Sequence, residues 1–188
     1  EQNLGFASEG AWDYASALKA AYLGFKAGNP NLPVAIGGYA MSKNWSHADI
    51  VMENGGGNYF DIFNIHSYVP LREYASTIKK VRTLLARHNI SERPIWVTEN
   101  GCRMEGSGKI ASYMAGIRAH SPEQEMIVAE FIPKMMILMQ SLGVDRDFFF
   151  VLPPYNEYGG NKDWGLMRRD YTVKPGFAVF ATLVDQLG

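Results

Sequence analysis

Short apolar runs alternate along the chain with longer stretches in which apolar residues recur at helical spacing, and this alternation constrains the fold more than any other feature. The predicted strands cover residues 33–38, 60–66, 94–98 and 148–152. The predicted helices cover residues 12–27, 47–54, 71–88, 121–142 and 177–187. Strands that are apolar throughout and separated by helices are typical of a parallel sheet covered by helices. Trp12 and Trp96 are predicted to belong to the core.

Two α/β architectures fit this order, an open doubly wound sheet and a (β/α)8 barrel. No glycine-rich phosphate-binding loop follows any predicted strand, which weakens the dinucleotide-binding alternative. Polar and aromatic residues stand instead after three of the strands: His66 with Tyr68, Glu99 with Asn100, and Tyr155 with Asn156. Because the active site of a barrel lies at the carboxyl ends of its strands, this pattern favours the barrel.

Composition excludes several classes of protein. Hydrophobic residues make up 47% and aromatic residues 13%, which is typical of a folded domain and not of a disordered chain. The net charge of −1 provides no basic surface for a nucleic acid, and no apolar run is long enough to span a membrane. The single cysteine, Cys102, permits no internal disulfide. The four histidines lack metal-ligand spacing, so we expect no metal site, and we also expect no cofactor.

Residues 96–101, Trp-Val-Thr-Glu-Asn-Gly, place a carboxylate at the end of a predicted buried strand, beside a turn. On these residues alone, Glu99 is either a structural carboxylate paired with an arginine or a group that takes part in chemistry. The Thr-Glu-Asn-Gly segment resembles the seventh strand of clan A glycoside hydrolases, in which a Thr-Glu or Ser-Glu pair carries the nucleophile. The resemblance implies a (β/α)8 barrel and a retaining mechanism for this chain.

The start of the chain, Glu1-Gln2-Asn3, resembles the end of strand four in the same clan, where a Glu acts as the acid/base. Gln2 stands where many members have Pro. Three predicted strands and three predicted helices separate Glu1 from Glu99, as strands four to seven require. Residues 61–68 are similar to strand six, 29–38 to the passage into strand five in xylosidase-like and cellulase-like members, and 163–176 to the segment before helix eight.

The resemblance therefore covers the whole chain as the C-terminal part of one catalytic barrel, residues 1–188, from the end of strand four to helix eight. It implies that the missing N-terminal half of the barrel is a partner of this chain. Four strands cannot close an eight-stranded barrel, so we expect the isolated chain to be a poor catalyst. An extracellular or periplasmic location is favoured, although any signal region would precede the chain.

The resemblance implies that Glu99 is the nucleophile and Glu1 the acid/base of a glycosidase acting on an oligosaccharide or polysaccharide, with β-linked sugars favoured. Retaining hydrolysis needs the two carboxyl groups roughly 5–5.5 Å apart, and it needs hydrogen bonds that keep the nucleophile ionised. The predicted substrate-binding residues are Asn3, Trp45, His66, Tyr68, Tyr155, Asn156, Glu157 and Trp164. Trp45, Tyr155 and Trp164 are the candidates for an aromatic surface on which a sugar ring rests.

Two alternatives remain open on the sequence. The first is a non-catalytic carbohydrate-binding or scaffold barrel, which the presence of both glutamates disfavours. The second is an unrelated barrel lyase or aldolase, which is disfavoured because no predicted strand ends in a lysine that could form a Schiff base.

Overall fold

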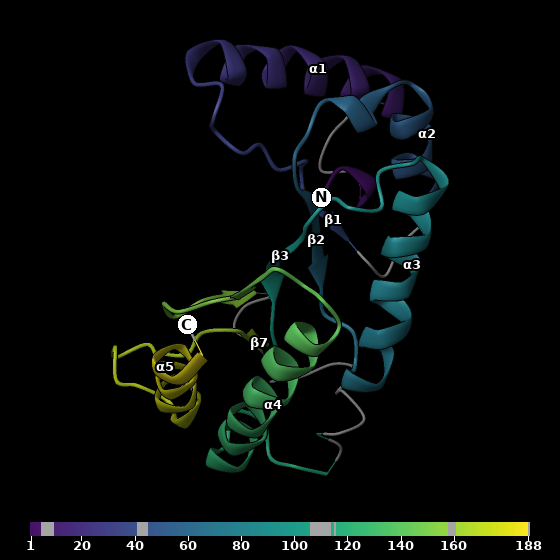
Figure 1. The fold of residues 1–188 in the computed structure, drawn as a ribbon. Coiled ribbons are helices and arrows are strands. Elements are labelled where there is room, and N and C mark those ends of the chain that lie inside the picture. Colours follow the sequence, from purple (N-terminus) through teal and green to yellow (C-terminus); the bar gives the residue numbers. More distant parts are fainter. Residues whose placement is uncertain (5–9, 41–44, 106–113, 115, 158–160, 188) are drawn as a thin grey trace. The chain divides into compact units, whose positions relative to one another are not determined.

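The structure is a computed structural model that describes residues 1–4, 10–40, 45–105, 114, 116–157 and 161–187 (Figure 1). The chain divides into two compact units. The first comprises Glu1–Glu99 and Met139–Phe148, and the second comprises Asn100–Leu138 and Phe149–Gly188.

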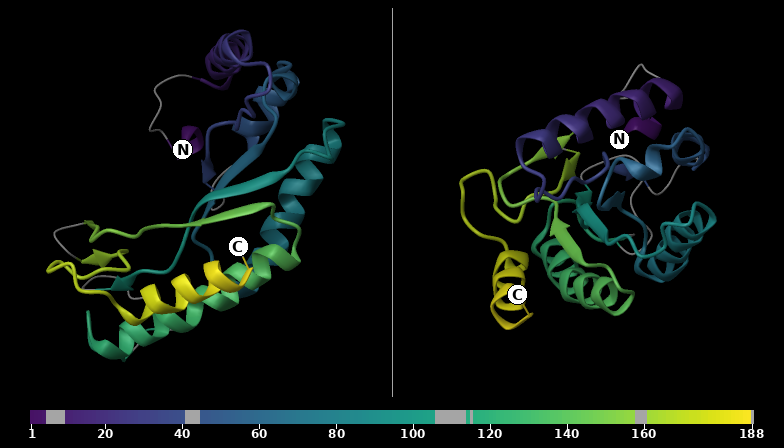
Figure 2. Two further views of the ribbon diagram at one scale, coloured as in Figure 1. Left: turned by 60° about the vertical axis from the view of Figure 1, so that its left-hand side comes forward. Right: turned by 45° about the horizontal axis from the view of Figure 1, so that its top comes forward.

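The first unit is built of helices and a sheet with the strand order β1-β2-β3-β5. Its strands are β1 (Tyr39–Ala40), β2 (Phe63–Ser67), β3 (Ile95–Asn100) and β5 (Arg146–Phe149), of which the last residues of β3 and β5 begin the second unit. Its helices are α1 (Ala11–Gly28), α2 (Ser46–Glu53) and α3 (Tyr74–Arg87), with short 3-10 turns η1 (Gln2–Leu4), η2 (Gly56–Asn58) and η3 (Leu71–Glu73). Strands β1 and β2 pair in parallel, which confirms the predicted mixed α/β fold with a parallel sheet (Figure 2).

The core of the first unit follows from the two periodicities in the sequence. In β2, Phe63 and Ile65 are completely buried, as are Ile95 and Val97 in β3. Helix α3 buries a stripe that includes Tyr74, Ile78, Val81 and Leu85, at the spacing of one helical face. Each such side chain contributes about 1.5–3 kcal/mol when it leaves water. This burial holds the strand ends in place.

All four predicted strands begin at other residues than the sequence indicated; β2 starts at Phe63 rather than at 60 and β3 at Ile95 rather than at 94. Residues 33–38 contain only an isolated bridge between Ala35 and Ile62, and β1 starts at Tyr39. Strand β5 starts at Arg146 rather than at 148 because Asp145 pairs with Ile95. The Ile95 N–H donates to Asp145 Oδ2 over 2.8 Å, and the Asp145 N–H donates to the Ile95 carbonyl over 2.9 Å. These bonds set the register before the apolar run begins.

The prediction that Trp12 belongs to the core is wrong, because its side chain is 63% exposed. Helix α1 buries Ala11, Ala15 and Leu18, which lie four and then three positions apart on one face. Trp12 is one position further around the helix from Ala11, and so it points to another side. Trp96 is half-buried, with the Arg146 guanidinium over its ring.

The second unit contains helix α4 (Pro122–Ser141) except for its last three residues, helix α5 (Pro175–Leu187) and a three-stranded antiparallel sheet. The strands of that sheet, in the order β4-β7-β6, are β4 (Met104–Glu105), β7 (Lys162–Asp163) and β6 (Asn156–Glu157). Sequence periodicity missed this sheet because strands of two residues have no detectable alternation. Helix α4 begins as predicted, with the Gln124 N–H donating to Ser121 Oγ. Within the described ranges, no helix combines the length and apolar character needed to cross a bilayer.

Candidate active site

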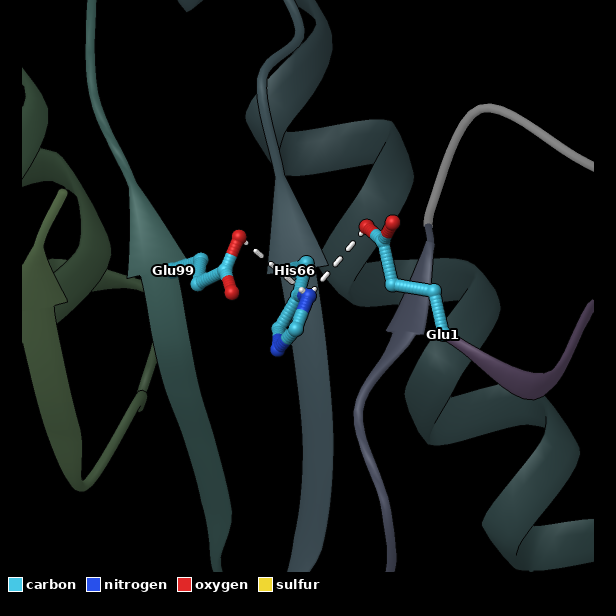
Figure 3. A group of neighbouring side chains, drawn as sticks. All are labelled: Glu1, His66 and Glu99. Carbon is cyan, nitrogen blue, oxygen red and sulfur yellow. Dashed lines mark hydrogen bonds and ion pairs between the residues drawn. The ribbon is translucent and has the colours of Figure 1, made fainter. Parts of the chain in front are cut away.

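Glu1, His66, Tyr68 and Glu99 come together in the first unit, although they are far apart in the sequence. His66 lies near the carboxyl end of β2, Tyr68 directly follows that strand, and Glu99 lies near the end of β3. Because β2 and β3 are neighbours in the sheet, their ends bring His66 and Glu99 side by side. Glu1 reaches the same place from the residue before η1 (Figure 3).

His66 lies between the two carboxylates, as Figure 3 shows. Its Nδ1 is 3.2 Å from Glu1 Oε1 and 3.5 Å from Glu99 Oε2. One ligand atom from each of the three residues can be chosen so that all three lie within 4.8 Å of one another. A carboxylate oxygen of Glu1 is thus within 4.8 Å of one of Glu99.

Glu99 is hydrogen-bonded and accessible to a ligand. The Tyr68 hydroxyl donates to Glu99 Oε2 over 2.8 Å. The side chain of Glu99 is 34% exposed, compared with 18% for Glu1 and 13% for His66. Among the residues that the structure describes, no arginine pairs with Glu99, which removes the main support for a purely structural carboxylate.

Glu1 is held in place by Asn3, which was predicted to bind the substrate. The Asn3 amide donates to the Ala40 carbonyl over 2.9 Å, and its Oδ1 accepts from the Ala40 N–H over 3.0 Å. Both ends of the Asn3 side chain are therefore engaged by β1, and the Leu4 N–H donates to the Glu1 carbonyl. Asn3 anchors the turn that carries Glu1, and its contacts do not favour the predicted substrate-binding role.

His66 has two further neighbours that the sequence analysis did not single out. Its Nε2 is 3.1 Å from Thr98 Oγ1, and the Thr98 hydroxyl donates to Asn64 Oδ1 over 2.8 Å. Asn64 is buried in β2, two residues before His66 and thus on the same face of the strand. In the sequence, the only sign of this contact was an asparagine two positions before a histidine in a predicted strand.

Glu1, His66 and Glu99 also form a set that could contact one metal ion, judged by the spacing of their ligand atoms. Each of these atoms already has a hydrogen-bonding or ionic partner within the group or in Tyr68. We therefore assign no metal to them, and the expected absence of a metal and of a cofactor stays a prediction.

Trp45 lies away from the carboxylates. It directly precedes α2 and lines a pocket of about 440 Å³ together with Lys79, Lys80 and Arg87 of α3. Neither Glu1 nor Glu99 lines this pocket. The proposed platform at Trp45 would thus face the α2–α3 groove rather than the carboxylate pair.

The remaining predicted substrate-binding residues belong to the second unit. Trp164 is only 6% exposed, with the Arg103 guanidinium over its ring and Phe150 against its edge, so its ring offers little surface to a sugar. Tyr155 is 42% exposed and is the better aromatic candidate. Asn156 and Glu157 form β6, and Glu157 Oε2 lies 3.7 Å from Lys162 Nζ.

A match to a family model identifies the class of protein. Residues 7–179 match the family model described as the glycosyl hydrolase catalytic core, and the chain belongs to this family. No curated protein matched the sequence in a separate search.

Solved glycosidases share the fold. A glucosidase from Croceicoccus marinus superimposes with a TM-score of 0.71 at 16% identity, over 95% of this chain and 37% of its own. Fungal β-1,4-galactanases superimpose with a TM-score of 0.65 at 18% identity, over 92% of this chain and 55% of their own. A GH39 β-xylosidase from Caulobacter crescentus superimposes with a TM-score of 0.62 at 17% identity, over 92% of this chain and 37% of its own. This chain thus spans between about a third and somewhat more than half of these relatives, and at such identities the likeness shows the fold alone.

Proposed function

We propose that this chain carries the two catalytic carboxylates of a retaining glycoside hydrolase, with Glu99 as the nucleophile and Glu1 as the acid/base. The observation that carries the proposal is the approach of the two carboxylates to within 4.8 Å, with His66 between them. Retaining enzymes hold their carboxyl groups roughly 5–5.5 Å apart and inverting enzymes roughly 6.5–9.5 Å apart, so oxygens of Glu1 and Glu99 within 4.8 Å of each other favour retention.

In the first step, a Glu99 oxygen attacks the anomeric carbon while protonated Glu1 donates its proton to the departing glycosidic oxygen. The C–O bond to the leaving group breaks, and an ester bond forms between the sugar and Glu99. The Tyr68 hydroxyl, 2.8 Å from Glu99 Oε2, orients the carboxylate for this attack. The other Glu99 oxygen is then the attacking atom.

In the second step, Glu1 acts as the base. Its carboxylate removes a proton from water, the water oxygen attacks the anomeric carbon, and the ester bond to Glu99 breaks. Both substitutions occur with inversion, so the configuration of the sugar is retained. Glu1 regains its proton and the site returns to its starting state.

In this proposal, the sheet β1-β2-β3-β5 corresponds to strands five to eight of a (β/α)8 barrel. The order of helices and strands and the fraction of the similar glycosidases that the chain covers support this assignment. Chain preceding Glu1 in a longer protein would supply the remaining strands. The substrate is a β-linked oligosaccharide or polysaccharide, since similar structures are described as a β-xylosidase and β-1,4-galactanases.

The test uses the protein with its native upstream sequence, assayed on a panel of aryl β-glycosides. Glu99→Gln should lower turnover by at least about 10⁴-fold, the loss seen when a nucleophile is removed. A 2-deoxy-2-fluoro glycoside should label the peptide that contains Glu99, and NMR should find the first-formed product with the configuration of the substrate. Turnover of Glu1→Ala should be recovered in part by azide, which needs no general base.

Glu92→Gln is the matched control, because Glu92 is exposed in the turn between α3 and β3. The proposal fails if Glu99→Gln retains turnover, if the label is found on another residue, or if the product is inverted. Saturable binding of an oligosaccharide without hydrolysis of any substrate in the panel would instead favour a carbohydrate-binding barrel.

A further inference from the structure

Four residues form a continuous line of polar contacts from the interior of the sheet to the carboxylate pair. Asn64 Oδ1 accepts from the Thr98 hydroxyl over 2.8 Å, and Thr98 Oγ1 lies 3.1 Å from His66 Nε2. On the other side of the ring, His66 Nδ1 lies 3.2 Å from Glu1 Oε1. Asn64 is buried, and Thr98 and His66 are partly buried, so water has little access to the line.

The direction of these hydrogen bonds determines which ring nitrogen holds the proton. A threonine hydroxyl has one hydrogen, and Thr98 gives that hydrogen to Asn64. Towards His66 it can then only accept, so Nε2 must carry the hydrogen. In a neutral imidazole one nitrogen is a donor and the other an acceptor. Nδ1 of neutral His66 is therefore a bare lone pair that faces Glu1 Oε1 at 3.2 Å and Glu99 Oε2 at 3.5 Å.

We propose that Asn64 and Thr98 are positioning residues that lock neutral His66 in the Nε2–H tautomer, so that His66 can bond Glu1 only when Glu1 holds a proton. This inference rests on the function proposed above for Glu1. The opposite tautomer would direct an N–H at Glu1 and stabilise its carboxylate, the wrong form for the first step. In the Nε2–H tautomer, Nδ1 instead accepts a hydrogen bond from the Glu1 O–H, and Glu1 stays protonated until the glycosidic oxygen binds beside it.

The tautomer can be measured without any substrate. We would record two-dimensional ¹H–¹⁵N spectra of the histidine rings of the 188-residue chain above about pH 8.5, where an ordinary imidazole is neutral. The ring nitrogen that carries hydrogen has a distinct ¹⁵N shift and distinct couplings to the ring protons. Loss of one set of signals in His66→Asn assigns the residue. We expect Nε2–H to predominate; a predominant Nδ1–H in the wild-type protein overturns the proposal.

Variants of the two positioning residues separate the lock from general packing. Asn64→Leu frees the Thr98 hydroxyl to donate to Nε2, so the tautomer should reverse to Nδ1–H, whereas Asn64→Asp keeps an acceptor and should keep Nε2–H. Thr98→Ser should behave as the wild type. Thr83→Val, on α3, removes a threonine hydroxyl that bonds only to its own helix and should leave the ring signals of His66 unchanged.

The proposal is wrong if Asn64→Leu leaves the tautomer unchanged in a chain whose circular dichroism shows the wild-type fold. If Asn64→Leu does not fold, the wild-type and Asn64→Asp spectra decide the question. In the catalytically competent protein, we expect Asn64→Leu to lower kcat on the order of tenfold with little change in KM, because the acid is less often loaded. The expected tautomer together with no hydrolysis by any form would contradict the proposed function alone.

Discussion

Gly38 directly precedes β1, and replacing it with alanine should disrupt the carboxylate site without breaking the fold. A Cβ atom at this position would meet the imidazole of His66, with Cδ2 at 2.7 Å and Cε1 at 2.8 Å and Nε2 nearer still. Ordinary contacts between carbon atoms are about 3.5–4.0 Å, so the ring would have to move by roughly 1 Å. The backbone at Gly38 is not left-handed, so the alanine itself is unstrained.

Moving the ring by that distance breaks its contacts with Thr98 and Glu1, which are 3.1 and 3.2 Å long. At about 0.5–1.5 kcal/mol for each hydrogen bond, the total loss is about 1–3 kcal/mol. If the bonds support the transition state, kcat/KM on an aryl β-glycoside should fall roughly 5- to 150-fold. The ring signals of His66 in NMR spectra should shift as well, which gives a measurement that needs no activity.

Gly24→Ala is the matched control, because nothing lies within 4 Å of a Cβ placed there, in the interior of α1. That variant should gain roughly 0.5–1 kcal/mol of stability from helix propensity and keep the His66 signals. Unchanged His66 signals and full kcat/KM in Gly38→Ala would refute the reasoning, because the ring would then have room that the structure does not show.

Three further predictions concern stability. Asp61→Ala should lower the free energy of unfolding in urea by roughly 1–3 kcal/mol, because Asp61 Oδ2 accepts from the Val34 N–H over 2.8 Å and that buried donor would lose its partner. Burial alone would raise the pKa of Asp61, but hydrogen bonds from the Lys26 ammonium, the Val34 N–H and the Tyr22 hydroxyl outweigh it and lower the pKa below its ordinary value of 3.8. This stability should therefore be lost as the pH falls below about 4, and urea titrations of Asp61→Asn should lack that step. Burial lowers the pKa of His47 below 6.5, so this side chain takes up its proton at a higher pH in the unfolded chain than in the folded one. The free energy of unfolding should therefore fall as the pH drops below about 6.5. An equal fall with pH in His47→Gln would contradict this. Glu125→Gln should lower the midpoint of thermal unfolding, because the Arg168 guanidinium donates to both Glu125 oxygens, over 2.8 and 2.6 Å. An unchanged midpoint would show that this ion pair contributes nothing to stability.

Local patterns in the sequence were sufficient for most helices and for the Thr-Glu-Asn-Gly turn. The stripe of α3 and the Ser121 cap of α4 depend on residues within one or two turns of each other, so they are visible without a fold. The same is true of Glu99, because a carboxylate that ends an apolar strand is a local pattern. The resemblance of that segment to a known strand end depended only on neighbouring residues.

Contacts between distant residues were decided by the tertiary structure. The short sheet β4-β7-β6, the exposure of Trp12 and the burial of Trp164 depend on which surfaces other elements cover, and periodicity within a segment contains no such information. The line from Asn64 through Thr98 and His66 to Glu1 joins two neighbouring strands and the start of the chain. The sequence determined which groups could take part in chemistry, whereas the pairing of β2 with β3 determined their distances, because only the sheet register brings residues 66 and 99 side by side.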